Sequence, residues 1–459
     1  MILAAFLALL GQGAASAPAS PALSRSLVIV APRGFHAALA PLVELRRAQR
    51  PVEVVELESV LAQGRGADDP EKLKLFLYEA WRSRSAGYVL LVGDADVMPV
   101  RYMVLDRVTK EAFDYAFYPS DLYYGDVAKA DGSFEDWNTR KDGFHAHYYG
   151  EVRGEKHKSD PVNFDGIDYV PELAVGRWPV SSADEVALLA KKTVNREEAA
   201  RRAARSAASA IPWHRRSGFA VVGGWVDCRP QFERMAASLD ARWSKQQYFY
   251  ADGSAERPAP PSEGELVGFL NSGAGLLVHA GHGHDHGWEH SLSTASIEKL
   301  QNSEMLPIVL SAGCSTARFA TLPPYEGYRD VLGAEHPGSN HGERFSAPPP
   351  PPAPYQRGKF NPSGFGEQLL RKGDGGAVAY FGCNTGSQPC GLTLVDGMVR
   401  GLATEGATLG DAWRDAIRHY FATEQLAALA PDDGWYPPSI FFQGMKFILF
   451  GDPCLTAAP

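Results

Sequence analysis

The chain has 459 residues, of which 45% are hydrophobic and 22% are charged, with a formal net charge of −9. This length allows two or three domains with an ample core, and the composition is ordinary for a globular protein. The negative net charge argues against a general nucleic-acid binder. No run beyond the N-terminus approaches the roughly 18 apolar residues of a spanning helix, so we expect no membrane span.

The N-terminus has the pattern of a secretory signal peptide. Residues 2–10 are apolar, and Ala-Ala-Ser-Ala at 14–17 has the small residues of a cleavage site. Two features are atypical: no Lys or Arg precedes the apolar run, and Pro18 would follow the cut. We expect residues 1–17 to be removed and the mature protein to be secreted, periplasmic or on the cell surface. The alternative is a misassigned start.

Strands and helices alternate along the next part of the chain. Residues 26–32, 52–57 and 88–92 have the apolar pattern of strands, and residues 35–49 and 70–83 have helical spacing. This alternation predicts a parallel sheet covered by helices.

Residues 103–170 interrupt the alternation and are rich in Asp, Gly, Tyr and His. Asp121, Asp126 and Asp131 lie close together here, and carboxylate oxygens are typical calcium ligands. No part of the segment fits a twelve-residue EF-hand loop, and a solvated loop with Asx turns is the alternative. Structural calcium is thus a candidate in this segment. We expect that the reaction of the protein itself requires no cofactor.

A long Ala- and Arg-rich helix predicted over residues 184–208 links two halves of the chain. The second half repeats the alternation, with expected strands at 219–222, 246–250, 276–278, 307–310, 377–381 and 445–450, and helices at 231–242, 262–271, 294–301 and 409–421. Residues 320–362 form an insertion that contains a proline run. We expect an N-terminal subdomain over 24–205 and a C-terminal subdomain over 206–459.

Two apolar runs of the second half end in residues that can carry chemistry. The first run breaks at Gly281-His282-Gly283, and the second at Gly313-Cys314. Functional groups of α/β sheets gather past the carboxyl ends of the strands. A thiolate there could act as a nucleophile, with an imidazole as its base and acid. The alternative is an ordinary buried cysteine. The chain has five cysteines, so in an oxidising compartment at least one stays unpaired, and Cys314 is the candidate.

These motifs resemble those of the gingipain-type cysteine peptidases, family C25, which share a caspase-like fold. The resemblance covers roughly residues 26–456 and is carried by Gly281-His282-Gly283 with Trp288, by Ala312-Gly313-Cys314, and by residues 88–100, 165–180, 365–370, 375–382 and 451–455. It implies a caspase-like three-layer α/β/α fold with mostly parallel sheets and two sibling subdomains. The implied activity is hydrolysis of protein or peptide substrates through a thioester, and gingipains give the precedent for a basic P1 residue.

The resemblance also implies roles for individual residues. Cys314 would be the nucleophile and His282 the base and acid. The backbone N–H groups of Gly283 and Cys314 would form the oxyanion hole. Asp227 is the acidic residue nearest to the expected third catalytic position, although it is not clearly in register. Trp288 corresponds to an aromatic residue near the specificity pocket, and calcium sites in related peptidases favour the calcium interpretation of the aspartates.

Two other functions remain open at this point. One is a non-catalytic caspase-like module that binds partners or assists secretion. The other is a metal-dependent hydrolase, because a cluster of histidines could hold zinc at a nonstandard spacing. Its members are His279, His282, His284, His286 and His290.

Overall fold

The computed structural model covers the whole chain and describes residues 25–104, 117–137, 162–163, 166–206, 211–251, 260–338, 349–358, 363–430 and 436–457. The expected signal peptide over residues 1–17 lies outside these ranges, so it stays a prediction.

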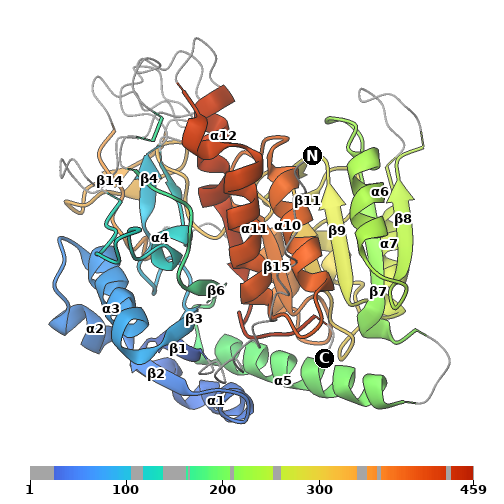
Figure 1. The fold of residues 1–459 in the computed structure, drawn as a ribbon, viewed down its shortest axis with the longest axis horizontal. Coiled ribbons are helices and arrows are strands. Elements are labelled where there is room, and N and C mark those ends of the chain that lie inside the picture. Colours follow the sequence, from blue (N-terminus) through green and yellow to red (C-terminus); the bar gives the residue numbers. More distant parts are fainter. Residues whose placement is uncertain are drawn as a thin grey trace, which may run out of the picture.

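A single ten-stranded sheet runs through the molecule (Figure 1), in the order β2-β1-β3-β6-β16-β15-β12-β9-β7-β8. Its strands are β1 (Ser26–Ala31), β2 (Val52–Glu56), β3 (Ala86–Val92), β6 (Ala174–Trp178), β7 (Arg216–Val221), β8 (Ser244–Phe249), β9 (Leu276–Ala280), β12 (Ile308–Ser311), β15 (Ala379–Cys383) and β16 (Phe447–Phe450). The expected α/β class with mostly parallel strands is therefore confirmed.

The two halves of this sheet run in opposite directions. Neighbouring strands are parallel throughout, except that β15 and β16 are antiparallel. β16 lies between β6 and β15, so a strand from the end of the described chain joins the halves. The carboxyl ends of β7, β9, β12 and β15 consequently meet at one edge.

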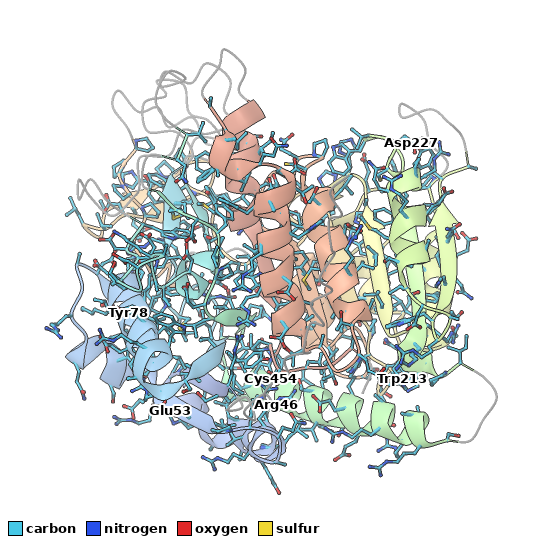
Figure 2. All side chains as sticks on the ribbon, in the orientation of Figure 1. Arg46, Glu53, Tyr78, Trp213, Asp227 and Cys454 are labelled. Atoms are coloured by element: carbon cyan, nitrogen blue, oxygen red, sulfur yellow. The ribbon has the colours of Figure 1, made fainter. Side chains whose placement is uncertain are left out.

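Helices cover both faces of the sheet and enclose two hydrophobic cores (Figures 1 and 2). One core includes side chains from α2 (Leu57–Gln63), α3 (Asp69–Arg84), α4 (Leu122–Gly125), α6 (Arg229–Ser238), α10 (Gly391–Ala403), α11 (Leu409–Thr423) and α12 (Tyr436–Lys446). The other includes side chains from α1 (Ala40–Arg47), α5 (Ala183–Arg205), α7 (Glu263–Asn271), α8 (Thr294–Ile297) and α9 (Phe365–Arg371).

Strand β9 shows how the sequence divides between these cores. Leu276, Val278 and Ala280 belong to the first core, and Leu277 belongs to the second. Because successive side chains of a strand point to opposite faces, His279 shares the face of Leu277. A strand buried on both faces is nearly all apolar. This explains why the residues of β9 form a nearly continuous apolar run.

Helix α10 was not predicted, and packing explains its presence. Gly397 and Gly401 lie in its interior, where glycine costs roughly 1 kcal/mol relative to alanine. A Cβ at these positions would lie 2.7 and 2.6 Å from the Cα atoms of Ala416 and Ala412 of α11. The glycines therefore let the two helices pack closely, and this contact outweighs the low helix propensity. No helix in the described ranges is both long enough and apolar enough to cross a bilayer.

Candidate active site

Two loops leave adjacent strands at the same edge of the sheet. Strands β9 and β12 pair in parallel, with His279 opposite Ser311. His282 follows β9 and Cys314 follows β12, so both loops begin at the same level. A Cβ added to Gly283 would lie 2.9 Å from the carbonyl oxygen of Cys314. The two loops thus contact each other through their backbones, beside both predicted residues.

Glycine is required on both sides of His282. Gly281 has a φ of 138°, and a Cβ there would lie 2.2 Å from the Cγ2 atom of Val222. A Cβ on Gly283 would also lie 2.6 Å from the Cγ2 atom of Thr316. Side chains at these positions would separate the loops, so the glycines permit their close approach.

Cys314 is held in a tight turn with its thiol partly exposed. Its Sγ accepts a hydrogen bond from the backbone N–H of Ser387 at 3.2 Å, in the loop after β15. The next residue, Ser315, has a φ of 56°, an uncommon conformation for a residue other than glycine. None of the five cysteines forms a disulfide, and the other four are buried. The same sulfur lies 3.7 Å from the Ser387 carbonyl oxygen, to which the thiol can donate.

The loop that carries His282 is fixed by neighbouring residues rather than by its ring. The carbonyl of His282 accepts from the N–H of Glu289 at 3.1 Å. Arg318 donates to Asp285 at 3.2 Å, and the N–H of Phe365 donates to the Asp285 carbonyl at 2.6 Å. The ring itself is partly exposed and has no hydrogen bond to any residue in the described ranges. It therefore remains available to a thiol or a substrate.

The sequence model of peptidase family C25 matches residues 20–458. The chain belongs to peptidase family C25. This membership makes it a cysteine-type endopeptidase. No curated protein matches the sequence.

The C25 fold is also seen in solved structures. The Arg-specific cysteine proteinase gingipain R (RgpB) matches with a TM-score of 0.58 and 17% identity over 96% of this chain and 80% of that chain. The complex of Porphyromonas gingivalis RgpB pro- and mature domains matches with a TM-score of 0.58 and 16% identity, over 94% and 79%. At this identity the likeness concerns the fold, and it confirms the gingipain-like architecture.

Asp227 of this C25 peptidase follows β7, at the edge of the sheet where the His282 and Cys314 loops begin, but its carboxylate is already engaged. It accepts hydrogen bonds from Nε of Arg229 at 2.8 Å and from Nη2 at 2.9 Å. These bonds lower the pKa of Asp227 to about 2. The structure thus pairs Asp227 with Arg229 and not with His282.

Trp288 packs in the interior beneath the site. It is 2% exposed, and its ring stacks on that of His279 with centroids 4.1 Å apart. Its Nε1 donates to the hydroxyl of Tyr380 at 3.3 Å. These contacts place Trp288 in the core, so its role near a specificity pocket stays a prediction.

The three aspartates expected to bind calcium have separate partners. Asp121 accepts two hydrogen bonds from Arg177, each at 2.7 Å. Asp126 accepts from Nε1 of Trp137 at 2.8 Å, and burial raises its pKa to about 8. Asp131 accepts from the backbone N–H of Ser133. The structure therefore does not gather them around one ion.

The histidine-rich loop does not form a metal centre either. His279 is buried, whereas the rings of His284 and His286 are exposed and stack with centroids 5.2 Å apart. Within the part of the chain that the structure describes, no group of three His, Cys, Asp or Glu side chains could hold a metal ion.

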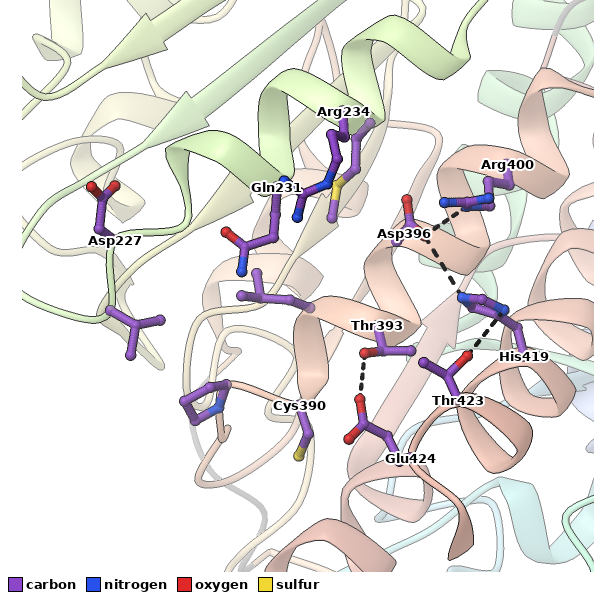
Figure 3. A pocket seen from close by; sticks show the side chains of 14 residues that line it. Asp227, Gln231, Arg234, Cys390, Thr393, Asp396, Arg400, His419, Thr423 and Glu424 are labelled. Atoms are coloured by element: carbon purple, nitrogen blue, oxygen red, sulfur yellow. Dashed lines mark hydrogen bonds and ion pairs between the residues drawn. The ribbon is translucent and has the colours of Figure 1, made fainter.

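A cleft of about 620 Å³ opens between α6, α10 and α11 (Figure 3). Its lining includes Asp227, Pro389, Cys390, Asp396 and Glu424. Pro389 comes two residues after Ser387, which contacts the Cys314 sulfur. The sequence predicted neither this cleft nor Ser387, because α10 was missed and Ser387 acts through its backbone.

Proposed function

We propose that this C25 peptidase cleaves peptide bonds by covalent catalysis, with Cys314 as nucleophile and His282 as base and acid. The observation that carries the proposal is the contact between the two loops, which leave the paired strands β9 and β12 and touch at Gly283 and Cys314. Family membership supplies the reaction class, and this contact supports the choice of the two residues.

The proposed reaction follows from the chemistry of these groups. His282 accepts the thiol proton, and the Cys314 thiolate attacks the scissile carbonyl. The backbone N–H groups of Gly283 and Cys314 stabilise the oxyanion. When the C–N bond breaks, His282 returns the proton to the leaving amine and a thioester forms. Water, deprotonated by His282, then hydrolyses the thioester and frees Cys314.

A dyad without a third side chain is consistent with the contacts of the loop. Asp227 is held by Arg229, while the bond from Glu289 and the Asp285–Arg318 pair fix the backbone around His282. On the opposite side, the Ser387 N–H donates to the Cys314 sulfur. We therefore leave Asp227 and calcium out of the proposed chemistry. Export, with residues 1–17 as signal, remains part of the proposal on sequence grounds.

We also propose that the cleft receives the P1 side chain and favours a basic one. Of the three carboxylates that line it, Asp396 pairs with Arg400 and His419, and Asp227 pairs with Arg229. Glu424 bonds instead to the neutral hydroxyl of Thr393 at 2.5 Å (Figure 3). Its negative charge is thus left without an ion-pair partner among the described residues and could meet a cationic P1 group.

Glu424→Gln should lower kcat/KM for substrates with Arg or Lys at P1 by about 10–100-fold, because it removes one member of a charge pair. Substrates with norleucine at P1 should be cleaved at an unchanged rate. Asp227→Asn is the matched control within the cleft, and we expect less than about a threefold effect because Arg229 already neutralises that carboxylate. Equal losses on basic and neutral substrates would rule out Glu424 as the specificity group.

Alkylation of the folded protein tests the dyad directly. Iodoacetamide should label Cys314 rapidly and singly at neutral pH, and His282→Ala should slow this labelling about tenfold or more, since the thiolate is the nucleophile. His284→Ala, an exposed histidine in the same loop, should leave the rate unchanged. Intact mass and peptide mapping identify the labelled cysteine. Equal rates in wild type and His282→Ala would refute the dyad and favour a non-catalytic module.

A further inference from the structure

His279 is a buried polar residue that the proposed mechanism does not use. It lies in β9, one residue before the end of the strand and three residues before His282, and it is 0% exposed. Burial lowers its pKa to about 3, so its ring is neutral near neutral pH. A neutral imidazole carries one N–H donor and one acceptor nitrogen. The group that accepts the hydrogen bond from the His279 ring therefore indicates what His279 does.

The ring is connected by hydrogen bonds to the residue that precedes the nucleophile. Nδ1 of His279 lies 2.9 Å from Oγ of Ser311, the residue opposite it on β12. Ser311 Oγ accepts from the N–H of Gly313 at 3.1 Å. Thr316 Oγ1 lies 3.2 Å from both Ser311 Oγ and the Gly313 carbonyl oxygen. The network thus reaches both polar backbone groups of Gly313.

The proton of His279 is assigned to Nδ1, which then donates to Ser311 Oγ. Thr316 donates its single proton to Ser311 Oγ or to the Gly313 carbonyl oxygen. The group left without a partner is Nε2, which lies buried with no hydrogen bond. In this arrangement Nε2 is an acceptor, whereas the opposite tautomer would bury an N–H donor without a partner, and buried N–H groups without partners are rare.

The ring also supports the turn sterically. A Cβ on Gly313 would lie 3.0 Å from Cε1 of His279, so the imidazole lies directly beneath the turn. Stacking on Trp288, with 3° between the ring planes, fixes the orientation of the ring. The turn continues into the left-handed conformation of Ser315, which the surrounding contacts must maintain.

We infer that His279 is a positioning residue for the nucleophile, holding the Gly313-Cys314 turn through Ser311 and Thr316. The inference rests on the proposed role of Cys314. Because His279 touches no substrate, its loss should reduce kcat and leave KM unchanged. It should also slow alkylation of Cys314, a readout that requires no peptidase activity.

Three single variants and one double variant test this inference. His279→Phe keeps a ring to stack on Trp288 but removes Nδ1, and Ser311→Ala removes the centre of the network with little change in volume. Each should lower kcat and the Cys314 alkylation rate about tenfold, because small displacements of reacting groups are costly. The double variant should be no worse than either alone. His279→Asn, whose amide can replace the Nδ1 donor, should recover part of the loss seen in His279→Phe.

His214→Phe is the matched control. His214 is 1% exposed and its pKa is lowered to about 4, so it is also a buried neutral histidine, but it precedes β7 at the other end of the strands. It should match His279→Phe in thermal stability without changing kcat or alkylation. Wild-type rates in folded His279→Phe and Ser311→Ala would overturn the inference, as would an equal loss in His214→Phe. If the wild type cleaved no peptide while both network variants still slowed alkylation, the positioning role would stand and only the peptidase proposal would fail.

Discussion

Replacing Cys314 by Ala, or His282 by Ala, should lower kcat/KM for peptide hydrolysis by roughly 10⁴-fold or more, because each removes a group that the covalent route requires. The two losses should not add in the double variant, since nucleophile and base act as one unit. KM values and the far-UV circular dichroism spectrum should stay close to those of the wild type. The measurement is steady-state hydrolysis of a peptide library on the purified mature protein.

Each of the two residues has a matched control of the same type. Cys228 is a buried thiol at the start of α6 and does not line the cleft, and His284 is an exposed histidine two residues beyond His282. Cys228→Ala and His284→Ala should retain activity within about threefold, as expected of substitutions outside the reacting groups. Substantial hydrolysis by Cys314→Ala would assign the activity to another nucleophile or to a contaminant.

Asp121→Ala should destabilise the folded state by about 3–5 kcal/mol, the cost of breaking a buried ion pair. The Arg177 side chain is 0% exposed, and it donates to both oxygens of Asp121 and to the Gly93 carbonyl. Without the carboxylate, the guanidinium charge would remain buried beside this carbonyl and the Phe319 ring, without its bidentate partner. Urea unfolding followed by tryptophan fluorescence measures the change.

The same experiment separates an ion pair from a calcium ligand. The loss in Asp121→Ala should be the same with added calcium and with chelator, and the double variant Asp121→Leu/Arg177→Met should recover much of it. Asp131→Ala, in the same acidic segment but exposed, should cost less than about 0.5 kcal/mol. A loss that appears only in the presence of calcium would contradict the ion-pair account.

Local sequence patterns predicted the parts of the fold that depend on local chemistry. The apolar runs of β9 and β12, each ending at glycine, indicated buried parallel strands. Because functional groups gather past the carboxyl ends of parallel strands, we expected His282 and Cys314 at one edge of the sheet. Helix α10 was missed because Gly397 and Gly401 lower its propensity, and their purpose is visible only in the contact with α11.

The sequence alone could not predict contacts between residues that lie far apart in the chain. Nothing in the acidic segment distinguishes an aspartate that binds calcium from one that pairs with Arg177, which lies 56 positions away. Ser387 contributes a backbone N–H, which every residue except proline possesses, so its type gave no signal. His279 was one histidine among several, and only the opposite strand shows that it bonds to Ser311.

The central place of β16 imposes an order on folding during synthesis. The ribosome makes residues 447–450 after all the other strands of the sheet, yet they lie between β6 and β15. Until they emerge, β6 and β15 lack the strand that lies between them, and β15, which carries the Ser387 loop, keeps one edge unpaired. The ten-stranded sheet that positions the proposed site is therefore completed only when β16 has been synthesised.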